Sequence, residues 1–388
     1  MELITRSLRA EKKIIEVIGP SFQNKGDALM AYAIEKKLGT RHIIIFNTIT
    51  KTPLIMQRLI QGIDRRLPRQ IKCLKYYLAY LLPKTLRLSW KILNYKDICG
   101  ILDCSGFQYG DQWTKLAHKL SWRIDHYRKL KKSGKKVIML PQALGPFKKK
   151  NVRSLILNIL DNVDLVFVRD KASSQNLLDL NIDTSLIEIV PDITNIVEGK
   201  RPKDALLWAD RVCIVPNKRM LDMTTSEVRS KYINFIIMII NEVRKRKLNP
   251  ILLLHEKGDY LIAKLINNRL GISLPIIDED PIITKGIIGC CHSVISSRYH
   301  ALVSALSQGI PSLATTWTHK YASLFEEFDR PECLFESLDS YKEVEKKLDL
   351  LTHPNSRSDL ITKIKEKADI ANQNVLKMWE KVEVLFES

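Results

Sequence analysis

The sequence predicts an α/β protein made of two Rossmann-like, doubly wound domains that face each other across a cleft. Short apolar runs alternate with segments of helical periodicity along most of the 388 residues. These runs lack the inside–outside alternation of half-exposed strands, which indicates parallel strands buried on both faces. The alternation begins again after the polar stretch 197–205. We therefore expect an N-terminal domain at 1–196 and a C-terminal domain at 206–388.

The N-terminal half begins with a strand, a glycine-containing loop, a helix and a second strand, which is the order of a βαβ unit. We expect Asp27 to cap the first helix and Gly39 to end it. The predicted strands lie at 12–20, 41–48, 97–106, 135–146, 164–170 and 187–192. The predicted helices lie at 27–38, 115–134, 151–163 and 171–182.

The C-terminal half repeats this order and ends in a charged, mostly helical tail at 340–388. Cys290 and Cys291 are adjacent and fall in an apolar, strand-like run. The predicted strands lie at 210–217, 249–256, 274–278, 292–295 and 310–316. The predicted helices lie at 232–247, 260–271 and 280–290, with a further helix that ends at 308.

Residues 51–96 interrupt the alternation and are expected to form a basic helical insert. Asp64 is the only acid among many lysines and arginines, which are interleaved with leucines and tyrosines. Such a segment is either a solvated or core-packing helical face or an interfacial helix that contacts an anionic membrane. Both interpretations remain open from the sequence.

Composition narrows the class of protein. The formal net charge of +19 favours acidic partners such as phosphorylated substrates or anionic membranes. Seven cysteines without a CxxC motif indicate reduced thiols and no cysteine-based metal site. The N-terminal residues do not resemble a signal peptide, and no apolar run reaches the ~18 residues of a membrane span. We expect a cytoplasmic protein, with peripheral contact at the inner face of the membrane as an option.

Polar residues and glycines gather where the predicted strands of the first half end. The carboxyl ends of parallel strands are where α/β domains bind ligands. Ordinary turns and polar loops, with Asp27 acting only as a helix cap, are the alternative. The candidates for lining the cleft are Asn24, Gly26, Asp27, Asp103, Ser105, Gln142 and Gly145.

Arg169 and His255 also follow apolar strands. Arg169 comes directly after "VFV", so it is a candidate anion ligand, unless it forms a structural pair with Asp170 or Asp192. His255 ends the run "LLL" and is either a cleft residue or a structural histidine.

The segment "SSRYH" at 296–300 carries the strongest chemical signal. Arg298 can hold a phosphate or carboxylate through two hydrogen bonds, and His300 can exchange a proton near neutral pH. The helix that follows directs its positive end at the same place. These features predict a site for an anionic substrate that also needs proton transfer. A structural Arg and His at a domain interface are the alternative.

The segments "NKGDA", "LPQALGP", "VRDKAS", "VPD" and "SSRYHALVSALSQGIP" resemble, in their order and spacing, the polysaccharide pyruvyl transferase family. The resemblance spans residues 24 to about 319 and implies a fold similar to the GT-B glycosyltransferases. It also implies transfer of the pyruvyl group of phosphoenolpyruvate to sugar hydroxyls as a ketal, without a metal or cofactor. By the same resemblance, Arg169, Arg298 and Tyr299 bind the donor and His300 is catalytic.

Two other functions remain open. A GT-B glycosyltransferase that uses a nucleotide sugar would show the same fold and charge. A non-catalytic binder of anionic surfaces would share the charge. No helix-turn-helix, zinc finger or RNP motif is present, so nucleic acid is not an expected partner. The expected partners are phosphoenolpyruvate and a saccharide acceptor, which a lipid carrier could hold.

Overall fold

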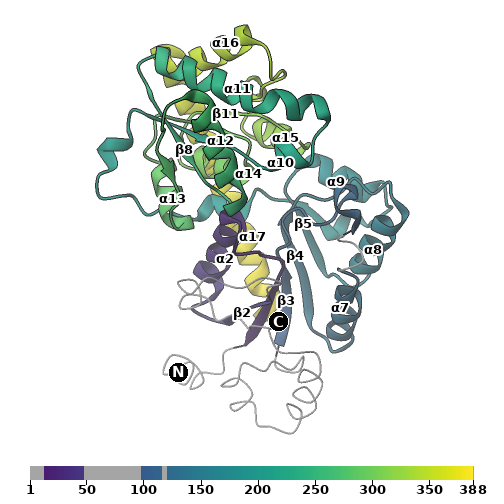
Figure 1. The fold of residues 1–388 in the computed structure, drawn as a ribbon. Coiled ribbons are helices and arrows are strands. Elements are labelled where there is room, and N and C mark those ends of the chain that lie inside the picture. Colours follow the sequence, from purple (N-terminus) through teal and green to yellow (C-terminus); the bar gives the residue numbers. More distant parts are fainter. Residues whose placement is uncertain (1–12, 48–97, 116–119, 388) are drawn as a thin grey trace, which may run out of the picture. The chain divides into compact units, whose positions relative to one another are not determined.

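The computed structural model describes residues 13–47, 98–115 and 120–387 (Figure 1). The predicted basic helical insert at 51–96 lies outside the described residues. The described chain forms two compact units, and each is treated by itself below. The first unit contains residues 1–22, 30–190 and 377–388, and the second contains 23–29 and 191–376. The ends of these units differ from the expected 1–196 and 206–388, because 23–29 and 377–388 each group with the other half of the chain.

The first unit is built on a six-stranded sheet in which every neighbouring pair is parallel. Its spatial order is β2-β1-β3-β4-β5-β6. The strands are β1 (Ile14–Ile18), β2 (Ile43–Asn47), β3 (Ile98–Asp103), β4 (Lys136–Gln142), β5 (Leu165–Val168) and β6 (Ile187–Ile189). The order reverses between β1 and β3, which makes the sheet doubly wound.

This reversal decides which helices cover which face. Right-handed crossovers that proceed in opposite directions along a sheet place their helices on opposite faces. Figure 1 accordingly shows α7 and α8 on one side of the sheet, and α2 and the end of α17 on the other. The helices are α2 (Lys25–Leu38), α7 (Trp122–Lys132), α8 (Lys150–Leu160), α9 (Lys171–Leu178) and α17 (Pro354–Glu387). Short 3-10 turns occupy Asp111–Trp113 (η2) and Thr184–Leu186 (η3).

The second unit has a five-stranded parallel sheet of order β11-β10-β7-β8-β9. Its strands are β7 (Arg211–Val215), β8 (Asn249–Leu253), β9 (Ile276–Ile277), β10 (Ser293–Ser296) and β11 (Ser312–Ala314). Its helices are α10 (Arg219–Asp222), α11 (Ser226–Lys245), α12 (Tyr260–Leu270), α13 (Pro281–Ile288), α14 (Tyr299–Leu306), α15 (Lys320–Glu327), α16 (Tyr341–Thr352) and most of α17. Its 3-10 turns are η4 (Ile193–Ile196), η5 (Ala205–Trp208), η6 (Lys257–Asp259) and η7 (Pro331–Cys333).

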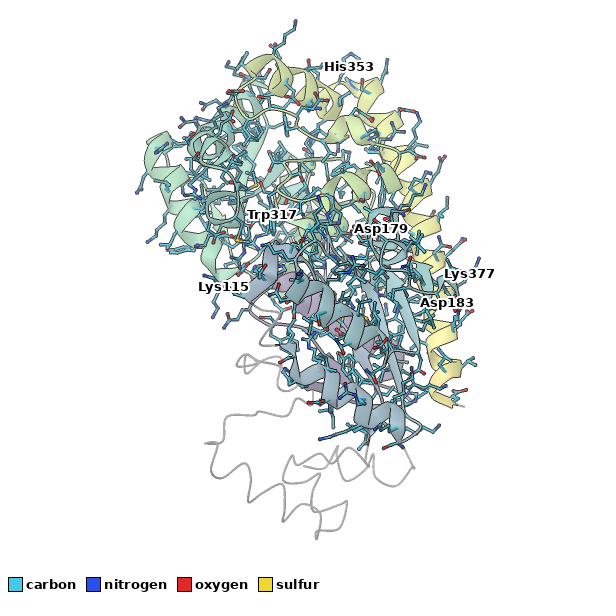
Figure 2. All side chains as sticks on the ribbon, turned by 90° about the vertical axis from the view of Figure 1, so that its right-hand side faces the viewer. Lys115, Asp179, Asp183, Trp317, His353 and Lys377 are labelled. Carbon is cyan, nitrogen blue, oxygen red and sulfur yellow. The ribbon has the colours of Figure 1, made fainter. Side chains whose placement is uncertain are left out.

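Both faces of this second sheet are buried, as the apolar runs predict. Val212 and Ile214 of β7 pack in a core that includes α11 and α12. Cys213 and Val215, the alternate residues of the same strand, pack in a second core with α13. Because both sets of side chains are buried, the strand reads as continuously apolar. In both units, exposed polar side chains lie on helices and turns, as Asp179, Asp183, His353 and Lys377 show (Figure 2).

The structure confirms the α/β class and the two Rossmann-like parallel sheets, and it corrects two details. Asp27 lies in the first turn of α2 rather than at its cap. The cap is Asn24, whose Oδ1 accepts a hydrogen bond from the Gly26 N–H at 2.8 Å. Cys290 and Cys291 lie in the turn after α13 and not in a strand, because β10 begins at Ser293.

The cysteines that the structure describes form no disulfide. Within residues 13–47, 98–115 and 120–387, no helix combines the length and the apolar character that crossing a bilayer requires.

Candidate functional site

In the second unit, His255 follows the carboxyl end of β8, and Arg298, Tyr299 and His300 follow that of β10. β10 ends at Ser296, and α14 starts three residues later. The intervening backbone is held in place, because the Ser297 carbonyl accepts hydrogen bonds from Asn217 Nδ2 (2.6 Å) and Tyr321 Oη (2.7 Å). The backbone N–H of Arg298 donates to Ser296 Oγ at 2.8 Å. The N-terminus of α14 is therefore rigidly placed before any ligand arrives.

His300 lies in the first turn of α14 and meets two segments of the same unit. Its Nε2 is 3.4 Å from Oδ2 of Asp192, a carboxylate that is 1% exposed. The other oxygen of Asp192 accepts hydrogen bonds from the N–H and hydroxyl of Thr194, which fixes the carboxylate. A buried carboxylate beside an imidazole orients the ring and stabilises its protonated form. This arrangement suits a general acid or base.

Gly26 contacts the other side of the His300 ring. A Cβ added at this position would overlap with the imidazole Nδ1 and Cγ atoms. The glycine is therefore required by close approach, since any larger residue would displace the ring. The predicted site residues Asn24 and Gly26 are thus brought to His300, which lies far from both in the sequence.

This close approach makes Gly26→Ala a specific probe of the His300 position. We expect turnover to fall by about 10²-fold, because small misplacements of a reacting group have effects of that size. Gly258→Ala is the matched control, since its Cβ would meet only the flexible Lys218 side chain, at 3.2 Å. Steady-state kinetics and thermal unfolding of both variants make the comparison. Equal turnover in the two variants would show that the ring is not positioned by Gly26.

Arg298 is buried and makes a closely fitted ion-pair cluster. Its Nε and Nη2 donate to the two oxygens of Asp259 at 2.9 and 2.5 Å. Its Nη1 donates to Glu256 Oε2 at 2.6 Å. Three of the five guanidinium N–H groups are thus used within the protein. Because Glu256 and Asp259 already engage Arg298, its binding of the donor stays a prediction.

The loop that carries these carboxylates also contacts the segment before α2. The Lys25 N–H donates to the His255 carbonyl at 3.1 Å, and Asn24 forms a β-bridge with Glu256. Lys25 Nζ donates to the Leu254 carbonyl at 2.6 Å and lies 2.9 Å from Asp278 Oδ1. These contacts join the predicted "NKGDA" and "LLLHE" strand ends into one cluster.

His255 is 2% exposed, and its Nε2 has no hydrogen-bond partner among the described residues. Burial, reinforced by the positive charges of Lys25, His300 and Arg298, holds the pKa of His255 well below its usual 6.5. The imidazole is therefore neutral at physiological pH. His255 contributes bulk and a dipole to the cluster rather than a charge.

The neutral state of His255 predicts a pH dependence of stability. Below about pH 6.5 the unfolded chain takes up a proton at this side chain that the folded chain does not, so stability falls as pH falls. The contribution of one such histidine approaches about 1.4 kcal/mol per pH unit. Denaturant unfolding between about pH 7 and 5 should show a shallower slope for His255→Leu than for the parent. Identical slopes would mean that His255 is protonated in the folded state.

Tyr299 presents a different environment from the one predicted for a donor ligand. Its side chain is 6% exposed and packs in the core of the second unit. Its ring meets the edge of the His300 ring with centroids 5.4 Å apart, and it also contacts Tyr321. Tyr299 thus supports the position of His300 through packing, and direct donor binding by its side chain stays a prediction.

In the first unit, Asp103 at the end of β3 centres a buried network. Its carboxylate accepts hydrogen bonds from Ser105 Oγ, from Tyr109 Oη (2.6 Å) and from Tyr127 Oη (2.8 Å). Arg123, which is 1% exposed, donates to Ser105 Oγ at 2.6 Å and to Tyr109 Oη. These bonds use the polar atoms of Asp103 and Ser105 to shape the loop after β3.

The neighbouring strand ends of the first unit hold Gln142, Gly145 and Arg169. Arg169 Nη2 donates to the Gly106 carbonyl at 3.1 Å, and its backbone N–H donates to the Gln142 carbonyl. Gln142 is fully buried, and its Oε1 has no hydrogen-bond partner among the described residues. Gly145 has a φ of +89°, a conformation that favours glycine. Asp103, Ser105, Gln142 and Arg169 therefore form a second candidate cluster, which belongs to the first unit.

Several residues in these clusters were not singled out from the sequence. Asp192 was considered only as a partner for Arg169, yet it lies beside His300. Lys25, Glu256 and Asp259 were not named as candidates. Lys25 and Glu256 each adjoin a predicted site residue in the sequence, and Asp259 lies three residues after Glu256 in the same loop, which was the available signal. Arg123 lies within a helix, and no local pattern indicates its burial.

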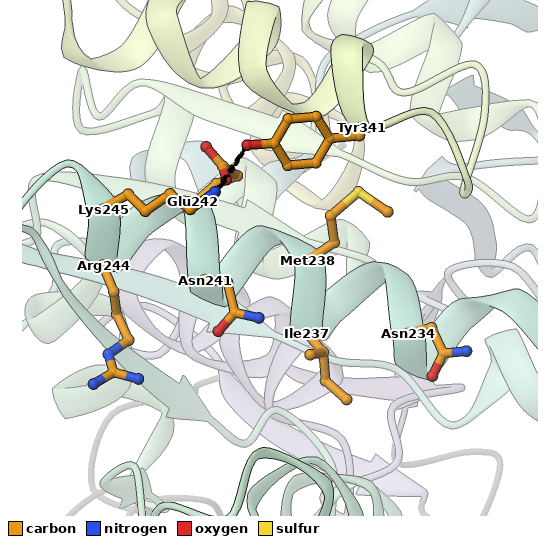
Figure 3. A pocket seen from close by; sticks show the side chains of 8 residues that line it. All are labelled: Asn234, Ile237, Met238, Asn241, Glu242, Arg244, Lys245 and Tyr341. Atoms are coloured by element: carbon orange, nitrogen blue, oxygen red, sulfur yellow. Dashed lines mark hydrogen bonds and ion pairs between the residues drawn. The ribbon is translucent and has the colours of Figure 1, made fainter.

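A shallow cavity of about 760 Å³ lies elsewhere on the second unit, between α11 and α16 (Figure 3). Glu242 accepts hydrogen bonds there from Lys245 and Tyr341, and a further one from Arg246. Burial opposes ionisation, but these bonds outweigh it and lower the pKa of Glu242 to about 2. The charged groups Glu242 and Lys245 are paired with each other, and none of the predicted site residues lines the cavity. The lining residues are Asn234, Ile237, Met238, Asn241, Glu242, Arg244, Lys245 and Tyr341.

Metal-ligating side chains do not cluster in the part of the chain that the structure describes, where no group of three His, Cys, Asp or Glu residues is suited to an ion. The predicted absence of a resident metal or cofactor stays a prediction.

The fold places the chain among proteins with two Rossmann-like domains of the GT-B type. Anabaena HepE in complex with UDP-glucose shares 12% identity and a TM-score of 0.58, over 95% of this chain and 99% of that one. A glycosyltransferase from Rickettsia africae shares 13% identity at a TM-score of 0.59, over 97% and 98%. A putative UDP-N-acetylglucosamine 2-epimerase from Listeria monocytogenes shares 13% identity at a TM-score of 0.59, over 93% of this chain and 94% of that one.

The family is shown by sequence. Residues 24–319 match the model of the polysaccharide pyruvyl transferase family. The match covers most of the chain and includes both candidate clusters. The chain belongs to the polysaccharide pyruvyl transferase family.

Proposed function

We propose that this protein transfers the pyruvyl group of phosphoenolpyruvate to hydroxyl groups of a saccharide and forms a ketal. The observation that carries the proposal is the His300–Asp192 pair at the N-terminus of α14. The first backbone N–H groups of a helix lack intrahelical acceptors and attract anions. An anionic donor held there would place its reacting carbon near a histidine that is equipped to move a proton.

The proposed chemistry assigns one proton-transfer role to His300. Protonation of the methylene carbon of phosphoenolpyruvate makes C2 electrophilic, and the oxygen of a sugar hydroxyl forms a bond to C2. The hydroxyl proton is lost to a base, and the C2–O bond to phosphate breaks, which releases inorganic phosphate. The oxygen of a second hydroxyl then bonds to C2, loses its proton to a base and closes the ketal. His300 is the proposed acid or base, and Asp192 orients its ring.

The other predicted ligands take supporting parts in this proposal. Arg298 holds the loop with Glu256 and Asp259 against the start of α14, and its two remaining N–H groups are the proposed contact with the donor. Arg169 is the proposed second cationic contact, as the family resemblance implies. The acceptor is a cell-surface polysaccharide or a precursor of one.

The donor is tested directly by calorimetry of the full chain with phosphoenolpyruvate and, separately, with UDP-glucose. We expect binding of phosphoenolpyruvate and, with a suitable saccharide acceptor, release of inorganic phosphate. Binding of UDP-glucose without binding of phosphoenolpyruvate would overturn the proposal in favour of a nucleotide-sugar glycosyltransferase. That alternative has the support of the fold, since HepE was crystallised with UDP-glucose. Binding of neither ligand would favour a non-catalytic role.

A further inference from the structure

The outward side of α12 combines exposed apolar and basic residues. Leu261 is 70% exposed, Tyr260 43% and Leu265 38%. Lys264 and Arg269 are exposed on the same helix. At 3.6 residues per turn, positions 260, 261, 264, 265 and 269 share one side, while Ile262, Ala263 and Ile266 face the core. This side of α12 is called the α12 face below.

The charge of the α12 face is not compensated by neighbouring acids. Between Lys257 and Ile277 the chain contains one acid, Asp259, which is buried against Arg298. Arg269 donates to the amide oxygen of Asn234 on α11 at 3.0 Å, so its partner carries no charge. Lys264 lies over the Tyr260 ring, 4.8 Å from its centroid. On α10, the carboxylate of Asp222 is paired with Lys218 and Arg219.

We propose that the α12 face docks on an anionic lipid bilayer. Exposed leucines and a tyrosine beside long basic side chains match the interface of a membrane, where apolar groups enter the acyl boundary and lysines reach the headgroups. The basic charge complements anionic headgroups. A compact acidic protein partner fits less well, because it would leave the leucines without an apolar cavity to fill.

The position of the α12 face relates it to the candidate site. α12 begins at Tyr260, directly after Asp259, and Asp259 pairs with Arg298. Lys257, two residues before Asp259, is also exposed. The face therefore starts at the edge of the second sheet that carries His300. Docking there would bring that edge to the membrane surface, where a lipid-linked acceptor would be found. The proposal concerns binding alone and does not depend on the identity of the donor.

Vesicle flotation of the full chain tests the proposal. Vesicles of phosphatidylcholine alone are compared with vesicles that also contain phosphatidylglycerol. We expect salt-sensitive binding to the second kind only. Leu261→Ser with Leu265→Ser, and separately Lys264→Glu with Arg269→Glu, should each reduce binding about tenfold or more. Leu206→Ser with Leu207→Ser is the matched control, because these leucines of η5 are 90% and 66% exposed; it should bind as the parent does.

Three results would overturn the proposal. The first is equal binding of the parent to both kinds of vesicle. The second is unchanged binding of both α12 variants, which would move the contact to another segment such as the predicted basic insert. The third is that only the variant Lys264→Glu with Arg269→Glu loses vesicle binding. If the variant Leu261→Ser with Leu265→Ser also binds vesicles and heparin, a soluble polyanion, as well as the parent does, the face would instead bind a soluble acidic partner. Since every substituted side chain is exposed, thermal unfolding should be unchanged and confirms that each variant is folded.

Discussion

His300→Ala is expected to lower turnover by about 10²–10⁴-fold, the usual contribution of a general acid or base. The expected reason is the loss of proton transfer, since the ring lies at the start of α14 beside Asp192. Affinity for phosphoenolpyruvate should change by less than about tenfold, because the proposed role of His300 is proton transfer in the transition state rather than ground-state binding. Phosphate-release kinetics and calorimetry measure the two quantities. Near-normal turnover would remove His300 from the chemistry.

Asp192→Asn separates orientation of the ring from proton transfer itself. An amide keeps the shape of the side chain but cannot stabilise an imidazolium, so we expect a smaller loss of turnover than in His300→Ala. The double variant should be no worse than His300→Ala alone, because both residues act through one group. Additive losses would show that Asp192 acts independently of His300.

Arg298→Met is expected to destabilise the fold by about 3–5 kcal/mol at neutral pH, the usual result of breaking a buried ion pair. The substitution leaves Asp259 buried without its cation. Burial already raises the pKa of Asp259, and Arg298 opposes that rise. Once Arg298 is removed, the folded chain should take up a proton there more readily than the unfolded chain. The destabilisation should therefore shrink as pH falls toward about 5, as urea unfolding at two pH values would show.

Two controls separate stability from ligand binding at Arg298. Arg298→Met combined with Asp259→Asn should recover part of the lost stability, because the buried charge is removed together with its partner. If Arg298→Met instead abolishes binding of phosphoenolpyruvate without any loss of stability, the arginine acts mainly as a ligand, as the sequence predicts. Unchanged stability and unchanged binding together would contradict both roles.

The elements of the fold were predictable because parallel strands leave a strong local pattern. After their first residues, Arg211 and Asn249, strands β7 and β8 are apolar, since alternate residues enter one of two cores. Glycines mark the ends of several helices, as at Gly39 and Gly271. The cap of α2 was assigned wrongly, because Asn24 and Asp27 are both good capping residues and the first turn of a helix accepts either.

The candidate site was predictable only as a set of strand ends. The order of the motifs indicated that Gly26, His255, Arg298 and His300 have functional positions, and the structure gathers them in the second unit. The motifs did not indicate that Gly26 contacts the His300 ring, or that Arg298 pairs with Asp259 and Glu256. Such contacts join segments that are far apart in the chain. The sequence does not say which of several distant residues becomes the partner of a given side chain.

The sequence by itself determined the α/β class, the two parallel sheets, the family and the chemical types at the strand ends. These follow from hydrophobic periodicity and from short motifs, which are properties of neighbouring residues. Tertiary structure alone decided the partners: Asp192 for His300, the acidic pair for Arg298, the buried neutral state of His255 and the exposed α12 face. Burial and pairing depend on what packs against a side chain, and distant segments supply those neighbours.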